Sequence, residues 1–192
     1  MNRFPNASRL ALSAAGLLLV AVTATAQTAQ PAQPGQPAPS ATATRLHEAD
    51  QAFIADGTKA VSTQRDAARI ANSRTSDSQV KAFSARAAAD YEKISQATRA
   101  ASPRGVDVPH NDPDVAALDG IKNLRGPEFD KAYLEQVALT GEQKTISVFQ
   151  AEIASGRDTK LKEVARQSLP ILQAHYAEAQ KLAQRHHLAS AQ

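Results

Sequence analysis

Four polar side chains that can bind a metal ion or transfer protons fall on the apolar stripes of four different predicted helices. They are Gln64, Tyr91, Glu142 and His175. If the four helices form a bundle, these side chains converge as one inward polar cluster. A carboxylate and an imidazole are suitable ligands for iron, zinc or manganese, with Tyr91 as a third ligand and Gln64 as an outer partner.

The same positions also suit a purely structural role. Tyr91 and His175 can lie at the edge of a core, while Glu142 pairs with a base or faces water. A di-metal carboxylate centre needs several carboxylates and a Glu-x-x-His spacing, and the sequence lacks that set. We therefore expect no cofactor, and a divalent metal has only His175, Glu142 and Tyr91 as candidate ligands.

Motifs for nucleophilic or phosphate chemistry do not occur. The sequence has no Gly-x-Ser-x-Gly elbow, no cysteine, no His-Glu-x-x-His and no phosphate-cradling glycine loop. We assign no catalytic residue, and the sequence favours a protein that is not an enzyme.

The elements that must position the cluster follow from apolar residues at helical spacing. Such stripes predict four long helices, at residues 46–71, 80–98, 127–156 and 158–182. Ser76 and Gln79 have the form of a capping box before the second helix, and Asp158 can cap the fourth. The connection 102–113 is too long for a simple turn, and a short helix is expected at 114–124. Two helical hairpins joined by a crossover make an all-α four-helix bundle.

Five short motifs occur in a distinctive order along the chain. They are Asp50-Gln-Ala-Phe53, Val80-Lys-Ala-Phe83, Phe129-Asp-Lys-Ala-Tyr133, Ile146-Ser-Val-Phe149, and Leu169-Pro170 ahead of His175. In this order they resemble an exported bacterial family of domains of unknown function, whose members are often labelled outer membrane proteins. The resemblance covers residues 46–185. It implies export and a ferritin-like four-helix bundle with a long crossover connection carrying a short extra helix.

The resemblance also shows where this chain departs from the family pattern. That pattern places histidines in the second, third and fourth helices and a glutamate in the first. Here Asp90 is followed by Tyr91, the third helix offers Glu142, the first offers Gln64, and only His175 fits.

The N-terminal region has the features of a secretory signal. Two arginines precede an apolar stretch at 10–22 and the small residues Ala24-Thr25-Ala26, which predicts a signal peptide at 1–26. Residues 27–44 are rich in Pro, Ala, Gln and Thr and are expected to form a disordered linker. The bundle domain is expected at 45–188, with a flexible tail at 189–192. Without cysteine the chain cannot be a lipoprotein, and we expect it to be periplasmic or secreted.

Charge and composition narrow the choice of function. Removal of residues 1–26 takes two of the 22 basic residues and leaves 20 against 19 acidic ones, interspersed along the chain. This pattern excludes nucleic-acid binding, and no transmembrane segment is expected after signal cleavage. The sequence favours a non-enzymatic binding or envelope-stress module with an envelope protein or polymer as partner, as a monomer or weak homo-oligomer. The alternative is a divergent ferritin-like metal-binding protein that uses His175 and Glu142.

Overall fold

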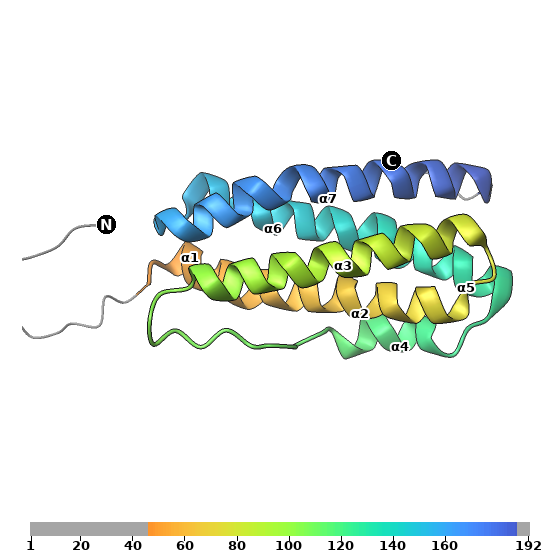
Figure 1. The fold of residues 1–192 in the computed structure, drawn as a ribbon, viewed down its shortest axis with the longest axis horizontal. Helices are drawn as coiled ribbons and strands as arrows, with labels where there is room; N and C mark the ends of the chain where they lie inside the picture. The colour runs from red at the N-terminus through yellow and green to blue at the C-terminus, as the bar shows by residue number, and fades with distance from the viewer. Residues whose placement is uncertain (1–45, 188–192) are drawn as a thin grey trace, which may run out of the picture. The chain divides into compact units, whose positions relative to one another are not determined.

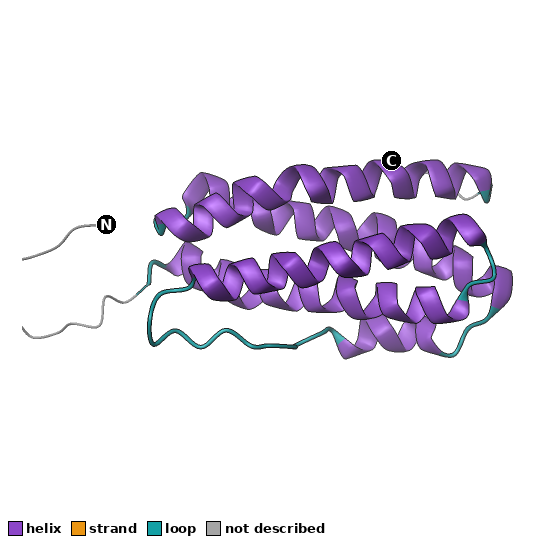
Figure 2. Cartoon of the chain, in the orientation of Figure 1, coloured by secondary structure: helices purple, strands orange, loops and turns teal. Residues whose placement is uncertain are grey.

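The computed structural model describes residues 46–187, which form helices joined by loops and contain no β-strand (Figures 1 and 2). The predicted all-α class is therefore confirmed. The expected signal peptide, linker and tail, at 1–26, 27–44 and 189–192, lie outside the described residues. No helix between residues 46 and 187 combines the length and apolarity that a membrane crossing requires.

The four segments predicted as long helices are helical, and two of them contain a π-helical stretch. The elements are α1 (Glu48–Ala52), η1 (Phe53–Gly57), α2 (Thr58–Arg74), α3 (Ser78–Ala101), α4 (Val115–Lys122), α5 (Gly126–Ala132), η2 (Tyr133–Gly141), α6 (Glu142–Ser155) and α7 (Thr159–Arg185), where η marks a π-helix. Elements α1, η1 and α2 follow one another without a break, as do α5, η2 and α6. The short helix expected in the crossover is α4.

The helices pack as two hairpins side by side. Helix α2 packs along α3, α6 packs along α7, and α3 contacts α7 between the hairpins (Figure 1). Apolar side chains fill the space between them in two clusters. One contains Phe129, which stacks on Tyr133 with ring centroids 5.9 Å apart. The other contains Phe53 and Phe149, whose rings meet edge to face at 5.0 Å.

Aspartates cap the starts of α3, α4 and α7. Asp158 accepts hydrogen bonds from the backbone N–H groups of Lys160 and Leu161, as predicted for the start of α7. The capping box predicted with Ser76 is wrong. Asp77 caps α3 instead, because its carboxylate accepts the N–H groups of Gln79 and Val80 at 2.7 and 2.9 Å, and a negative charge is favoured there.

The π-helical stretches η1 and η2 are features that the three-and-four spacing did not predict. A π turn hydrogen-bonds from residue i to i+5 and so adds one residue to the helix, which changes the face that later residues present. In η2 the inward positions include Val137, Ala138 and Leu139 in succession. The first residue after η2 is Glu142, which is buried.

The crossover segment, residues 102–114, is joined to α2 by polar contacts. The Ser62 and Thr63 hydroxyls accept the backbone N–H groups of Asp112 and Asp114 at 3.3 and 2.7 Å. The Arg65 guanidinium, 1% exposed, donates to Asn111 Oδ1 at 2.7 Å. These bonds hold an otherwise irregular stretch of chain against the helix face (Figure 1).

Candidate functional site

Three of the four predicted cluster residues meet in the interior. Tyr91 lies on α3, Glu142 begins α6 and His175 lies on α7, and their exposed fractions are 2%, 1% and 4%. The Tyr91 hydroxyl donates a hydrogen bond to Glu142 Oε2. On the other side of the carboxylate, Glu142 Oε1 lies 3.6 Å from His175 Nδ1. We refer to Tyr91, Glu142 and His175 as the buried cluster.

Asp90 contacts the buried cluster and was missed as a candidate. Its Oδ2 lies 3.3 Å from His175 Nε2, so the imidazole ring is held between two carboxylates. The sequence did indicate that Asp90 lies on the inward side of its helix, because it follows Ala87 by three residues and precedes Ile94 by four, and both of these are buried. That spacing places Asp90 beside the apolar stripe of α3.

The surroundings shift the pKa values of two members of the buried cluster. Burial alone lowers the pKa of His175, but the close approach and charge of Glu142, followed by those of Asp90, outweigh it and raise this pKa above the ordinary value. Burial, followed by the charge of Glu142, raises the pKa of Tyr91 well above its ordinary value. Tyr91 therefore stays a hydrogen-bond donor, and protonation of His175 is favoured by two carboxylates.

Gln64, the fourth predicted residue, hydrogen-bonds to the backbone of η2 and not to the buried cluster. Its Nε2 donates to the Val137 carbonyl in η2 at 3.1 Å. It also packs on Gly141, where a β-carbon would lie 2.7 Å from Gln64 Nε2. The amide thus satisfies a backbone carbonyl of the π-helical stretch one turn before Glu142, and glycine at 141 leaves it room.

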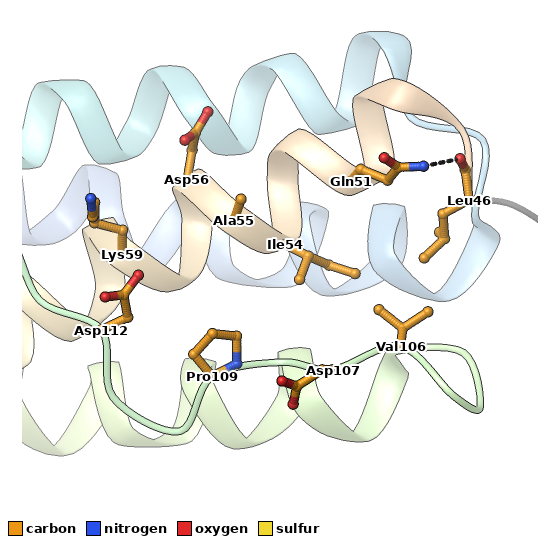
Figure 3. A pocket seen from close by; sticks show the side chains of 10 residues that line it. All are labelled: Leu46, Gln51, Ile54, Ala55, Asp56, Lys59, Val106, Asp107, Pro109 and Asp112. Atoms are coloured by element: carbon orange, nitrogen blue, oxygen red, sulfur yellow. Dashed lines mark hydrogen bonds between the residues drawn. The ribbon is translucent and has the colours of Figure 1, made fainter.

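An open cavity lies between the crossover segment and the first long helix. Its volume is about 410 Å³, and we call it the crossover groove (Figure 3). It is lined by Leu46, Gln51, Ile54, Ala55, Asp56, Lys59, Val106, Asp107, Pro109 and Asp112. Ile54 and Val106 face each other across it, and the amide of Gln51 donates to the Leu46 carbonyl at 2.6 Å (Figure 3).

A second cavity of about 250 Å³ shares Asp56 and Lys59 with the crossover groove. Its lining also includes Gln64, Val137 and Gly141. The amide of Gln64 therefore forms part of a cavity wall, whereas Tyr91, Glu142 and His175 line neither cavity.

A family model described as "Domain of unknown function (DUF4142)" matches residues 35–182, well over half of the chain. The chain belongs to the DUF4142 family. Searches of curated proteins and of solved structures gave no match. The predicted resemblance to a family of domains of unknown function is thus confirmed, and the DUF4142 match includes the buried cluster and the crossover groove.

The buried cluster of this DUF4142 domain does not fit a di-metal centre. Asp90 and Glu142 approach opposite nitrogens of His175, so they cannot converge on one ion through that ring. Over residues 46–187, no three His, Asp or Glu side chains are arranged to hold a metal ion. Among the described residues neither Glu142 Oε1 nor His175 Nδ1 has a hydrogen-bond partner, and the two atoms face each other at 3.6 Å, which leaves a two-ligand position with Tyr91 beside it.

Proposed function

We propose that this DUF4142 chain is an exported, non-enzymatic binding module built on a ferritin-like four-helix bundle, with the crossover groove as its ligand site. Two observations support the bundle, namely the paired hairpins and the long crossover with α4. The signal-like residues 1–26 support export. The observation that carries the binding function is the crossover groove itself, an open cavity, whereas the buried cluster is at most 4% exposed and out of reach of a substrate.

The lining of the crossover groove defines a ligand class. Its volume of about 410 Å³ falls in the range of small-molecule pockets, which are mostly apolar with a few polar groups. Leu46, Ile54, Val106 and Pro109 offer apolar contact, while Asp56, Asp107 and Asp112 outnumber Lys59 at the rim. The groove therefore suits a neutral or cationic compound with an apolar body and disfavours anions.

The groove is tested with the neutral apolar dye Nile red. We expect its fluorescence to rise on binding the full chain, and Val106→Ser to weaken binding roughly tenfold through the loss of about 1–2 kcal/mol of apolar contact. Val115→Ser is the matched control, because Val115 is 64% exposed on α4 and does not line the groove.

Equal binding to the two valine variants would show that the dye does not use the groove and would remove the basis of the proposal.

Export is tested separately by the intact mass of the chain recovered from the periplasm of a bacterial host. We expect a mass that corresponds to a start at Gln27. An unprocessed chain confined to the cytoplasm would contradict export.

Metal binding is the second candidate function, favoured by the facing atoms Glu142 Oε1 and His175 Nδ1, which have no hydrogen-bond partner within residues 46–187. The test is the metal content of chain purified from periplasm without tag or chelator, compared with His175→Ala. On the main proposal we expect no stoichiometric metal. About one equivalent of one metal, lost in His175→Ala with the helical circular-dichroism spectrum intact, would instead make the domain a divergent metalloprotein.

A further inference from the structure

Two buried carboxyl groups, those of Asp50 and Glu152, lie at the turn between α6 and α7, and neither lines the crossover groove. Asp50, on α1, is 1% exposed, and its Oδ1 accepts the backbone N–H groups of Arg157 and Asp158 at 2.8 and 2.9 Å. This carboxylate joins the first helix of the domain to the start of α7. The bonds satisfy donors that would otherwise be unpaired in the turn.

Glu152, in the last turn of α6, is the second group. It is 1% exposed, and neither of its side-chain oxygens has a hydrogen-bond partner within the described residues. Its carboxyl group covers Gly156, because a β-carbon at position 156 would collide with Glu152 Oε1. The backbone at Gly156 is extended, with φ of −61°, so a larger residue there would have to displace the Glu152 carboxyl group rather than strain the backbone.

A buried carboxylate with no partner is costly, and a second carboxylate beside it makes the ionised pair worse. A proton on one of the two acids removes both problems, because it neutralises one charge and provides a donor. We propose that Glu152 is protonated and donates its O–H to the Asp50 carboxylate, forming an acid–carboxylate pair that holds the α6–α7 turn against α1 and loosens when the proton leaves.

The charges around Glu152 are consistent with this pair. Burial, followed by the neighbouring Asp50, raises the pKa of Glu152 to about 7. Asp158, the cap of α7, acts in the same direction, and Lys162 on α7 opposes it. From η1, Asp56 lines the same small cavity of about 140 Å³ as Glu152 and adds a further negative charge.

The sign of the pH dependence follows from the raised pKa. In the unfolded chain Glu152 ionises near its ordinary value of 4.5, whereas in the folded chain it keeps its proton to about pH 7. Its stabilising contribution is therefore complete below pH 4.5 and is lost as the pH rises towards 7. Above pH 7 both carboxyl groups are ionised, and their repulsion lowers the stability of the fold by an amount that no longer changes with pH.

The first measurement is a carbon-13 NMR titration of the Glu152 carboxyl group in the full chain and in Asp50→Asn. We expect a midpoint near pH 7 in the wild type and a fall towards 4.5 in Asp50→Asn, whose amide oxygen can still accept from the turn. An ordinary midpoint in the folded wild type, or a midpoint that Asp50→Asn leaves unmoved, would overturn the proposal.

The second measurement is chemical unfolding of Glu152→Gln at pH 5 and pH 8. Glutamine keeps the donor and cannot ionise, so we expect its advantage over the wild type in the unfolding equilibrium constant to be at least about tenfold larger at pH 8 than at pH 5, since each pKa unit corresponds to tenfold. Glu163→Gln, an exposed change on α7, is the control and should show no such difference.

Hydrogen exchange tests whether the pair holds the α6–α7 turn against α1. The amides of Arg157 and Asp158 should lose protection between pH 6 and pH 8 in the wild type and keep it in Glu152→Gln.

The same samples are tested with Ca²⁺ and Mg²⁺ at pH 8. If either ion stabilises the wild type but not Glu152→Gln, the two acids bind a cation rather than share a proton, and the proposal is wrong.

Discussion

Replacement of Glu142 by alanine should lower the free energy of unfolding by about 3–5 kcal/mol, the usual cost of removing one partner from a buried charged pair. The variant leaves the Tyr91 hydroxyl without its acceptor and His175 without the carboxylate that faces its Nδ1, all at positions that are at most 4% exposed. It also leaves a cavity at the start of α6. Urea unfolding followed by circular dichroism measures the loss.

Glu135→Ala is the matched control for this prediction. Glu135 lies in η2 on the same long helix and is half-buried. We expect a change below about 1 kcal/mol for it. If Glu142→Ala were no more costly than Glu135→Ala, the buried cluster would not contribute to stability.

Removal of the Arg65 side chain is the second large effect that we expect. Arg65→Ala should cost about 3 kcal/mol, because the guanidinium is buried and its three partners lose a shared donor. Those partners are Glu92 on α3 at 3.1 Å, Asn111 in the crossover segment at 2.7 Å, and Asp66 at 3.4 Å. The crossover segment should become less protected from hydrogen exchange at the same time.

Arg69→Ala separates burial from charge in this comparison. Arg69 contacts the same two carboxylates, Asp66 and Glu92, but its side chain is 56% exposed. Exposed ion pairs contribute little, so we expect a loss below about 1 kcal/mol. Similar losses in the two arginine variants, or an unchanged crossover segment in Arg65→Ala, would contradict the role given to Arg65.

The helices and most of the helix starts could be predicted because they depend on local spacing. Apolar residues at three-and-four intervals located all four long helices, and Asp158 was recognisable as a cap from its neighbours alone. The start of α3 shows the limit of such reasoning. Asp77 and Ser76 are both good capping residues, and the choice depends on which side chain reaches the free N–H groups.

The missed features share a different cause. Asp50, Arg65, Asp90 and Glu152 are charged residues at inward positions, and spacing rules assign inward positions by apolar type. Three of them, Asp50, Arg65 and Asp90, have partners distant in the sequence, which spacing cannot reveal; Asp90 and His175, for example, are 85 residues apart. The π-helical stretches were missed for a related reason, since an i to i+5 hydrogen bond has no compositional mark.

The contact of Asp50 with the turn after α6 also bears on how the chain folds as it is made. Asp50 is separated from Arg157 and Asp158 by 107 and 108 residues, so its two hydrogen bonds close the chain from α1 to the start of α7 into one loop. Synthesis proceeds from the N-terminus, and contacts of high sequence separation form late and slowly. A nascent chain that ends before residue 157 has no donors for this carboxylate, so α1 gains these two hydrogen bonds only after the turn that follows α6 has been made.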